Sequence, residues 1–340
     1  QSFTFSTVVF LGMPTAYISG IGMYVPPKVV RNDDLRAWYD TSDEWIYTRS
    51  GIKERRWVEE PASTAELGLY AAQEALRQAG KSPSDIDLII FATLSPDMYF
   101  PGSGVLLQHK LGLETTPALD IRQQCSGFVY GLSIADQYIR SGMYKTILLV
   151  GAEIQSTWID YSPEGRTVGV LFGDGAGAVV VEASQEPGRG ILSTHLYSQG
   201  AYAMELCVAE PSSATRSHVL PGSYGMRPYM NGKEVFRHAV QRMGEAVQAA
   251  LAAQQWSPEE VDLFVLHQAN IRIVQAVAEF FNLPMEKFFN NIHKYGNTTA
   301  ASIPICLYEA QAEGRLKRGD KVILAAFGSG FTWGSAALIW

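Results

Sequence analysis

Two stretches of the chain carry the same pattern of polar and apolar positions. The first, SPSDIDLIIF, covers 82–91, and the second, SPEEVDLFVL, covers 257–266, about half the chain further on. Each copy follows an amphipathic helical stretch, at 66–79 and 235–254, and enters an apolar run that is typical of a buried strand. Ser-Pro followed by polar and acidic residues stops a helix and forms a short capped turn. The pattern therefore predicts helix, turn and buried strand twice along the chain.

The likeness between the two halves continues downstream of these strands. Each half has a further helix, an apolar strand and a glycine-rich turn into a last strand, at 127–141, 146–151 and 173–181 in the first half and at 300–314, 321–326 and 328–339 in the second. Strands that alternate with helices indicate buried sheets covered by helices. We therefore expect an α/β protein with two duplicated halves, pseudo-twofold symmetry and a site where the halves meet.

The domain boundaries follow from this repeat. We predict an N-terminal half at 13–182, a connecting segment with loops at 183–229, and a C-terminal half at 230–340. The connecting segment is rich in Gly, Pro and Ser and has no convincing helical period. Residues 1–12 are apolar but lack the charged flank and cleavage site of a signal peptide, and we expect them to be a tag or an extension before Met13.

Composition and charge narrow the classes of function. The chain has 340 residues and 47% hydrophobic residues, which suits two compact units or one large layered domain and excludes intrinsic disorder. With 27 Lys and Arg against 34 Asp and Glu, the net charge is −7, so the chain carries no electrostatic footprint for nonspecific binding of nucleic acid. An anionic ligand would have to meet a local cluster of Arg or Lys.

The cysteines and the apolar runs add two exclusions. Three widely separated cysteines without a CxxC pair argue against a disulfide framework and against a cysteine-rich zinc site, and we expect free thiols in a reducing cytoplasm and no metal. No run of about 18 apolar residues occurs, so we expect no membrane span.

Two polar residues stand at the ends of predicted apolar strands, where α/β sheets place catalytic groups. Cys125 lies in DIRQQCSGF (120–128), directly before a predicted helix whose N-terminus favours a thiolate. His267 follows the second repeated strand in LHQANIRI (266–273). The structural alternatives are a small residue at a helix entrance for Cys125 and a satisfied histidine at the core edge for His267.

Asn297 and two glycine-rich loops complete the set of candidate chemistry. Asn297 stands just before a helix, at nearly the place that Cys125 holds in the first half, and helix capping is its structural alternative. The loops GDGAG (173–177) and GSGFTWG (328–334) lack the phosphate-binding patterns, so their glycines are expected to bring backbone N–H groups close to a reacting atom.

Taken together, these motifs resemble the ketoacyl-ACP synthase III family of the thiolase-like superfamily over about 15–340. The matching motifs, in order, are TSDEWIYTRSGI (41–52), CSGF (125–128), FGDGAG (172–177), HQAN (267–270), GNTTAAS (296–302) and FGSGFTWG (327–334). The resemblance implies a thiolase-like fold, in which two βαβαβαββ halves form five αβαβα layers.

The resemblance also implies a reaction. Cys125 would attack an acyl-CoA, and the malonyl thioester of acyl carrier protein (malonyl-ACP) would then lose CO2 to give an enolate that condenses with the acyl-cysteine. His267 and Asn297 would stabilise the enolate, backbone N–H groups of Cys125 and of the loop at Ser329 would hold the oxyanion, and Phe327 would press on the malonyl carboxylate.

Further residues are assigned by the same resemblance. It implies that Trp45, Arg49 and Arg166 hold the nucleotide of CoA, that Gly232, Phe236 and Asn270 line the pantetheine tunnel, and that Phe100 reaches across a homodimer interface into the neighbour's acyl pocket. The resemblance implies acyl-CoA and malonyl-ACP as substrates, with no permanently bound cofactor. The expected partners are acyl carrier protein, which would need a basic rim from residues such as Arg49, Lys233, Arg242 and Arg272, and a second copy of the chain.

The sequence departs from the family pattern at several points. Gln123 and Gln124 replace small residues before the nucleophile, and Ser329 replaces a central glycine of the last loop. These departures keep open a specialised acyltransferase or condensing enzyme of secondary metabolism. A non-catalytic partner subunit is disfavoured because Cys125 is present, and a thiolase because no second cysteine follows Cys306. A cysteine hydrolase remains an alternative for the bare Cys and His pair.

Overall fold

The computed structural model of the protein describes residues 14–59, 61–213 and 227–340. The stretch 1–12, for which we predicted a tag or an extension, lies outside the described residues. Within the described ranges, helices and strands alternate along most of the chain, as the sequence pattern predicted.

The first sheet comes from the N-terminal half and, within the described ranges, has five strands in the order β1-β7-β6-β4-β5. These are β1 (Ala16–Tyr24), β4 (Leu88–Ala92), β5 (Ala118–Ile121), β6 (Thr146–Glu153) and β7 (Gly175–Ala183). β4 runs parallel to β5 and β6, whereas β1 and β6 are antiparallel to β7. β4 and β6 are buried along their whole length, which is why both are continuous apolar runs in the sequence.

The second sheet repeats this arrangement. In the described part of the chain it has four strands in the order β11-β12-β13-β8, namely β8 (Gly190–Ser198), β11 (Leu263–Leu266), β12 (Lys321–Gly328) and β13 (Thr332–Ile339). β11 is parallel to β12, and β13 is antiparallel to both neighbours, as β7 is in the first sheet. The strand that would correspond to β5 is reduced to one bridge between Phe264 and Phe288.

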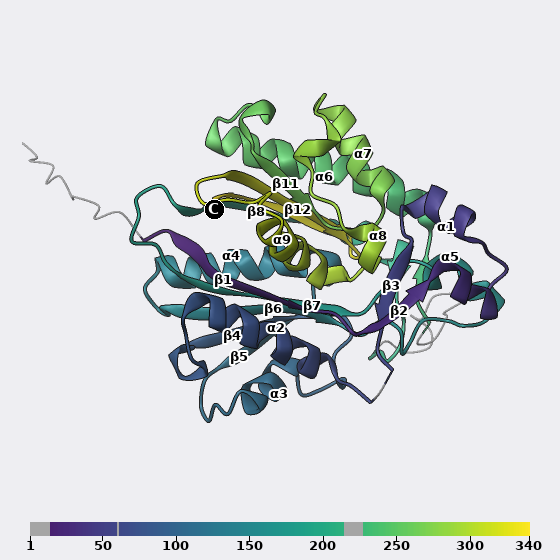
Figure 1. The fold of residues 1–340 in the computed structure, drawn as a ribbon, viewed down its shortest axis with the longest axis horizontal. Helices are drawn as coiled ribbons and strands as arrows, with labels where there is room; N and C mark the ends of the chain where they lie inside the picture. Colours follow the sequence, from purple (N-terminus) through teal and green to yellow (C-terminus); the bar gives the residue numbers. More distant parts are fainter. Residues whose placement is uncertain (1–13, 60, 214–226) are drawn as a thin grey trace, which may run out of the picture.

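Helices separate and cover the two sheets in five layers (Figure 1). α2 (Thr64–Ala79) and α3 (Ser103–Lys110) cover the first sheet, α4 (Gly127–Arg140) and α9 (Ser302–Ala312) lie between the sheets, and α6 (Gly232–Gln254) and α7 (Ile271–Phe280) cover the second sheet. Three large apolar clusters fill the spaces between successive layers, and the central one joins both sheets to α4 and α9. The predicted five-layer αβαβα architecture is confirmed.

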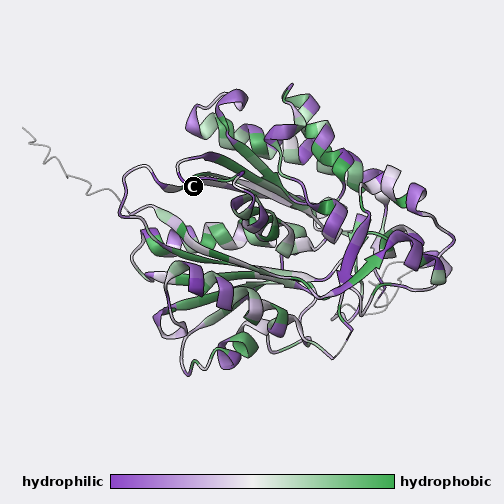
Figure 2. Cartoon of the chain, viewed as in Figure 1, coloured by the Kyte–Doolittle hydropathy of each residue, from purple (hydrophilic) through white to green (hydrophobic). Residues whose placement is uncertain are grey.

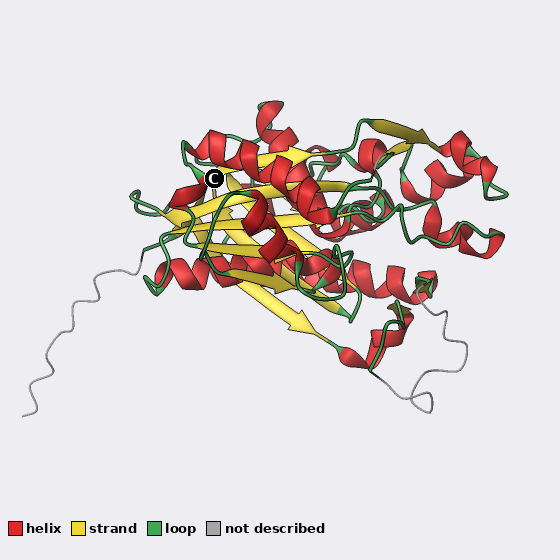
Figure 3. Ribbon diagram, turned by 90° about the horizontal axis from the view of Figure 1, so that it is seen from below, coloured by secondary structure: helices red, strands yellow, loops and turns green. Residues whose placement is uncertain are grey.

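Hydropathy follows the layers. The strands of both sheets are coloured mainly as hydrophobic, whereas the outer helices mix hydrophilic and hydrophobic segments (Figure 2). A view from below shows the strands running through the middle of the molecule with helices on both sides (Figure 3). None of the helices in the described ranges combines the length and the hydropathy that crossing a bilayer would need.

Short elements gather at one end of the sandwich, beyond the ends of the strands (Figure 1). They are β2 (Lys28–Arg31), β3 (Glu54–Trp57), α1 (Asp43–Ser50), α5 (Arg166–Gly169) and α8 (Ile292–Tyr295), and an apolar cluster of their side chains holds them together. The small ribbon of β9 (Leu206–Cys207) and β10 (Tyr229–Met230) leads into α6. Among these short elements, α1 and α5 carry the three residues that the sequence assigned to the nucleotide of CoA, namely Trp45, Arg49 and Arg166.

The repeated turn forms as its residues predicted. Ser82 and Ser257 open 3-10 turns at Pro83–Asp85 and Pro258–Glu260, and each turn has a reciprocal capping box with the acidic residue three positions on. The two hydrogen bonds of such a box satisfy backbone donors that would otherwise lack partners at the start of the turn. The same local structure therefore precedes β4 in the first half and β11 in the second.

The predicted connecting segment at 183–229 needs a correction. Gly190–Ser198 is not a linker, because it forms β8 and pairs with β13 along its length. The second half of the sandwich therefore begins at β8 rather than at residue 230. Most residues of β8 are half-buried and several are polar, so the strand lacks the apolar run that revealed the other strands.

Candidate active site

Cys125 lies at a tight turn between β5 and α4. It is the middle residue of the 3-10 turn Gln124–Ser126, which leads directly into α4 as predicted. Gln124 has a φ of 46°, a left-handed conformation that a non-glycine residue rarely adopts. Thr299 has the same φ of 46° and stands at the equivalent position of the second half, in the turn Thr299–Ala301. The two halves thus share a strained turn, and its second copy carries Ala300 where the first has Cys125.

This alignment corrects the position that we predicted for Asn297. Asn297 does not hold the place of Cys125 in the second half, because the turn that corresponds to Gln124–Ser126 begins two residues after it. Asn297 lies in the extended approach to that turn, where its backbone pairs with Leu171 and Gly173.

The loop that joins β12 to β13 approaches Cys125 closely at Gly328. A Cβ atom added at Gly328 would lie 2.9 Å from the Cβ and 3.0 Å from the backbone nitrogen of Cys125. Any larger residue would therefore clash with the nucleophile's own backbone. This close approach explains the glycine and places the loop that begins at Gly328 against Cys125.

The expectation of a stabilised thiolate is wrong for this structure. Burial raises the pKa of Cys125 to about 12, and the carboxyl group of Glu153 acts in the same direction. Only 8% of the residue is exposed, and the loss of hydration disfavours the charged thiolate. The resting group is a neutral thiol that must lose its proton as it attacks.

Glu153 ends β6 and is fully buried beside this thiol. Its carboxyl group accepts hydrogen bonds from the hydroxyls of Thr93 (3.0 Å) and Ser95, and from the backbone N–H of Leu94 (3.2 Å). Burial nevertheless raises the pKa of Glu153. The sequence did not suggest a carboxyl group here, and its hydrogen bonds make it a fixed structural group rather than a free base.

His267 follows β11 and is held by a serine of α9. Its Nδ1 lies 2.7 Å from the Ser302 hydroxyl, whose oxygen also receives the backbone N–H of Gln268 at 3.4 Å. The Ser302 proton is available for Nδ1, and in the tautomer that accepts it the ring proton lies on Nε2. Burial lowers the pKa of His267 to about 3, so the ring is neutral. Its Nε2 is buried and has no hydrogen-bond partner among the described residues.

Asn297 reaches the same turn from the other side. Its Oδ1 accepts a hydrogen bond from the backbone N–H of Thr299 at 2.9 Å, which leaves the amide NH2 group for another partner. The turn Thr299–Ala301 packs against the turn of Cys125. Because Ser302 follows this turn directly, the turn connects Cys125, His267 and Asn297. The turn thus links the segments that carry the three predicted catalytic residues, and of these three only Cys125 lines the cavity described below.

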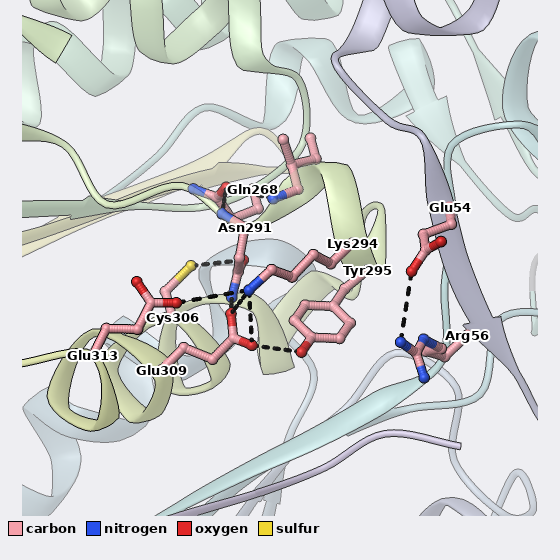
Figure 4. A network of polar contacts seen from close by, with 10 residues as sticks. Glu54, Arg56, Gln268, Asn291, Lys294, Tyr295, Cys306, Glu309 and Glu313 are labelled. Carbon is pink, nitrogen blue, oxygen red and sulfur yellow. Dashed lines mark hydrogen bonds and ion pairs between the residues drawn. The ribbon is translucent and has the colours of Figure 1, made fainter. Parts of the chain in front are cut away.

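A polar network fixes the segment that leads to Asn297 (Figure 4). The side chain of Gln268, next to His267, accepts hydrogen bonds from the backbone N–H groups of Asn291 and Ile292, both at 3.2 Å. Asn291 and Tyr295 in turn donate to the carboxylate of Glu309 in α9, at 3.0 and 2.6 Å. Figure 4 shows Asn291, Lys294 and Tyr295 converging on Glu309, which ties the approach to Asn297 to the helix that carries Ser302.

A cavity of about 630 Å³ reaches Cys125. Its lining includes the polar side chains of Gln124, Gln155 and Thr299 and the charged side chains of Asp97, Arg122 and Glu210. The rest of the lining is largely apolar and includes Leu94, Met98, Ile154, Trp158, Ile159, Phe172, Leu206 and Val208. Ser329 also lines this cavity, so the last loop faces the same space as the thiol. Such a cavity can hold an apolar acyl chain attached to Cys125.

Phe327 lies outside the lining of this cavity, in the apolar layer between the second sheet and its outer helices. It is 4% exposed and its ring centroid lies 4.8 Å from that of Phe331. Its contact with a malonyl carboxylate stays a prediction.

The residues assigned to the nucleotide of CoA come together. The guanidinium carbons of Arg49 and Arg166 lie 4.5 and 4.7 Å from the centroid of the Trp45 ring. Arg166 is also held by the carbonyl of Asp40 at 2.8 Å. An aromatic face with two guanidinium groups offers both stacking and phosphate-binding chemistry.

The residues assigned to the tunnel lie next to this group. Asn270 caps α7 by accepting from the backbone N–H of Arg272 at 2.9 Å, and its NH2 group donates to the carbonyl of Arg49 at 2.8 Å. Phe236 packs under the Arg272 guanidinium at 5.4 Å, and Gly232 begins α6 one turn earlier. As far as the chain is described, the 630 Å³ cavity is lined by none of the CoA or tunnel residues.

Phe100 is strongly exposed, with 79% of its surface accessible. Its neighbours Tyr99 and Met98 are also exposed and line the cavity. Within the described ranges, no three His, Cys, Asp or Glu side chains gather as metal ligands would. Sequence reasoning missed Ser302, Glu153 and Thr299, and the repeat could have signalled Ser302 because it follows the counterpart of the cysteine turn.

The sequence of this chain matches family models and known proteins over most of its length. The family described as 3-oxoacyl-(acyl-carrier-protein) synthase III matches residues 119–200, and the family of its C-terminal part matches residues 251–340. A beta-ketoacyl-(acyl-carrier-protein) synthase III of Aquifex aeolicus is 47% identical over 94% of this chain and 98% of its own length.

Two solved structures extend the comparison. The crystal structure of 3-oxoacyl-(acyl-carrier-protein) synthase III from Aquifex aeolicus has a TM-score of 0.88 at 45% identity, covering 96% of this chain and 100% of that one. The priming β-ketosynthase of the R1128 polyketide pathway also has a TM-score of 0.88, at 31% identity and 98% coverage of both chains. The predicted thiolase-like fold is thereby confirmed.

Proposed function

The chain belongs to the 3-oxoacyl-(acyl-carrier-protein) synthase III family, and we propose that Cys125, His267 and Asn297 carry out its reaction. The protein is an acyltransferase that condenses an acyl-CoA primer with a malonyl thioester on acyl carrier protein in fatty-acid biosynthesis. The observation that carries the assignment of residues is the turn Thr299–Ala301, which packs against the turn of Cys125 and connects it to His267 and Asn297.

The first half-reaction is transfer of the acyl group to the thiol. The sulfur of Cys125 attacks the thioester carbonyl, its proton is lost, and CoA leaves as the free thiol after it takes up a proton. Backbone N–H groups of Cys125 and of the loop at Ser329 are the proposed donors to the oxyanion. The close approach of Gly328 to the Cys125 backbone supports this assignment, because donors on these two segments would lie beside the same reacting carbon.

The second half-reaction is decarboxylation and condensation. Loss of CO2 from the malonyl thioester leaves an enolate, whose oxygen needs hydrogen-bond donors. A neutral His267 with its proton on Nε2 and the NH2 group of Asn297 supply two such donors. The enolate carbon attacks the acyl-cysteine, which yields the 3-oxoacyl product and releases the Cys125 thiolate, and the thiolate takes up a proton from solvent to become a thiol again. Phe327 is the proposed apolar contact for the malonyl carboxylate.

Acyl-CoA and carrier protein are the proposed partners at the rim formed by α1, α6 and α7. Trp45, Arg49 and Arg166 offer stacking and phosphate contacts for the nucleotide, and Gly232, Phe236 and Asn270 mark the proposed pantetheine path. Lys233, Arg272 and Arg49 supply positive charge for an anionic carrier protein. Arg242 is a weaker candidate because it is paired with Glu245 at 2.6 Å and Gln199 at 2.9 Å.

We also propose that two copies of the chain form a homodimer. β5 is an edge strand of the first sheet, and the exposed Phe100 precedes α3, which packs on β4 and β5. An exposed edge and an exposed aromatic side chain can both be covered by a second copy of the chain. The reducing cytoplasm remains the proposed location, and the three cysteines are free, as that location requires.

The specialised enzyme of secondary metabolism is not favoured. The synthase III structure from Aquifex aeolicus is more similar in sequence to this chain than the priming ketosynthase is, at 45% against 31%. Despite the departures Gln123, Gln124 and Ser329, the chain has all three proposed catalytic residues, Cys125, His267 and Asn297.

The proposal is tested by the division of labour between the residues. The Cys125→Ala variant should fold and form no covalent adduct with any acyl-CoA in intact mass measurements. His267→Ala and Asn297→Ala should still become acylated and should fail to release labelled CO2 from malonyl-ACP. An acyl adduct on the Cys125→Ala variant would contradict the assignment of the nucleophile. Release of free acid without CO2 by the unaltered protein would favour a hydrolase.

A further inference from the structure

The side chain of Ser329 makes a contact that the proposed reaction does not require. Its hydroxyl donates a hydrogen bond to the backbone carbonyl of Leu206 in β9. Ser329 belongs to the loop that approaches Cys125, whereas Leu206, Cys207 and Val208 form part of the cavity wall. One hydrogen bond therefore joins the loop at the reacting carbon to the wall that an acyl chain would touch.

A second connection joins the same two segments. The backbone groups of Phe331 and Gln199 exchange two hydrogen bonds, at 2.8 and 3.0 Å. The side chain of Gln199 is fixed in turn by Arg242 of α6 at 2.9 Å. The Phe331 end of the loop is thus anchored by its backbone, which no side-chain change alters. At the Ser329 end, the bond to Leu206 depends on the hydroxyl alone.

The contact also extends toward the nucleophile. The carbonyl of Ser329 accepts from the Thr332 hydroxyl at 3.1 Å, and that hydroxyl lies 2.7 Å from the Ser126 hydroxyl. Ser126 is the residue after Cys125, and both Ser126 and Thr332 are buried. Hydrogen-bonded groups therefore run from the cavity wall at Leu206 through Ser329 and Thr332 to the turn of the nucleophile.

We propose that the Ser329 hydroxyl determines which acyl primers the enzyme accepts, by holding the Leu206–Val208 wall against the loop that faces Cys125. The inference rests on the proposed function, because it concerns the acyl group carried by the same thiol. A glycine at this position, which the family pattern has, cannot make the bond. The wall is then free to move away from the first carbons of the acyl chain.

The physical consequence is a difference between primers rather than a uniform change of rate. A linear two-carbon acyl group is short enough to leave the wall untouched. An acyl group branched next to the carbonyl occupies the space beside Leu206 and meets the wall as Ser329 holds it. Loss of the bond should therefore favour branched primers relative to acetyl, whereas a merely structural role would change all primers equally.

The test is a comparison of acylation rates with acetyl-CoA and 2-methylpropanoyl-CoA, followed by intact mass measurement of the protein. In the Ser329→Ala variant, the rate ratio of branched to acetyl primer should rise roughly three- to ten-fold, the range that one neutral hydrogen bond supports. Ser329→Thr keeps a hydroxyl and should restore a ratio close to that of the unaltered protein. Ala and Thr retain a side chain, so neither adds the backbone freedom of glycine.

A matched control is available in Ser133, whose hydroxyl lies 2.8 Å from that of Thr194 and which does not line the described cavity. Ser133→Ala should leave the ratio unchanged. An unchanged ratio in Ser329→Ala, an equal fall for both primers, or the same shift in Ser133→Ala would overturn the inference while acylation of the unaltered protein still supports the proposed function. If the unaltered protein forms no acyl adduct at all, the proposed function fails and this inference with it.

Discussion

His267 and Ser302 stand in the second half of the protein where Ala92 and Gly127 stand in the first. The imidazole Nδ1 lies 2.7 Å from the Ser302 hydroxyl, and the Cβ of Ala92 lies 3.1 Å from the Cβ position of Gly127. Both pairs join the C-terminal end of a strand, β4 or β11, to the first residue of a helix between the sheets, and they are separated along the chain by the same interval as the repeated turns. The same contact is therefore a polar pair in one copy and an apolar pair in the other.

For the nucleophile, the first half carries the functional group and the second half carries the small residue. Cys125 has Ala300 as its counterpart, at the same position of the repeated turn. Each half has thus kept one functional group and holds a small residue at the site of the other. A thiol from the first half and an imidazole from the second can then share one site where the halves meet. The pseudo-symmetry brings these two groups together at the ends of the two sheets.

The first prediction concerns the bond between Ser302 and His267. Ser302→Ala should slow release of CO2 from malonyl-ACP about 10- to 100-fold, because Nδ1 loses the donor that keeps the ring proton on Nε2. This loss of rate is smaller than the loss expected when a hydrogen-bond donor to the enolate is removed altogether. Acylation of Cys125 should change little, since it needs no proton on Nε2. Single-turnover acylation and labelled-CO2 release measure the two steps separately, and Ser302→Thr should recover part of the second. Equal losses in both steps would contradict the prediction.

The repeat made much of this fold predictable from the sequence. Ser82 and Ser257 carry the information for their turns locally, through the acidic residue three positions on, so the helix, turn and strand that surround each are fixed by short-range chemistry. The apolar strands β4 and β6 were equally clear, because a strand buried on both faces needs no polar positions.

Other features depended on tertiary packing and escaped the sequence. β8 is half-buried at the edge of its sheet, so its pattern is indistinct. The pKa of Cys125 was expected to fall because a helix begins there, whereas burial from both halves raises it. Burial depends on residues far apart in the chain, such as Gly328 and Glu153, and no local motif reports it.

The second prediction concerns the dependence of stability on pH. The pKa of His267 is about 3 in the folded protein and near 6.5 in an unfolded chain, so protons bind preferentially to the unfolded state below about pH 6.5. The free energy of unfolding should therefore fall as the pH decreases from 6.5 toward 3. At pH 5 the contribution of this residue is about 2 kcal/mol.

The test compares denaturant unfolding of the protein and of His267→Gln at pH 7.5 and pH 5. Other titrating groups are shared by both proteins and cancel in the difference. The variant should lose about 2 kcal/mol less stability between the two pH values. Parallel losses in both proteins would show that His267 is protonated in the folded state.

The third prediction is that Trp45 binds the nucleotide of acyl-CoA and does not contribute to the reaction of the thioester. Trp45→Ala should raise the KM for acyl-CoA about 5- to 100-fold, the range expected for loss of one stacked base. An acyl thioester of pantetheine, which lacks the nucleotide, should react with the variant as it does with the unaltered protein. Trp38→Ala is the matched control, because Trp38 is exposed and packs on Trp57 and Tyr161 rather than on the two arginines. A similar loss with both thioesters would place the nucleotide elsewhere.

The fourth prediction concerns Phe100. We expect this side chain to enter the acyl pocket of a second copy, because it is 79% exposed and next to Met98 and Tyr99, which line the cavity. Phe100→Ala should change the acyl-chain preference of the enzyme and weaken the dimer in sedimentation measurements. Phe280→Ala is the matched control, since Phe280 is 65% exposed at the end of α7, and it should alter neither.

Mixing two variants distinguishes a contact across the interface from an effect within one chain. In a mixed dimer of Cys125→Ala and Phe100→Ala subunits, one site has an intact Cys125 and faces Phe100 of the partner subunit. That site should show the acyl-chain preference of the unaltered protein, although neither variant alone does. If Phe100 acted on its own chain, the only site with a thiol would still lack it, and the mixture would keep the altered preference. Recovery on subunit exchange is therefore expected only if Phe100 completes the neighbouring site.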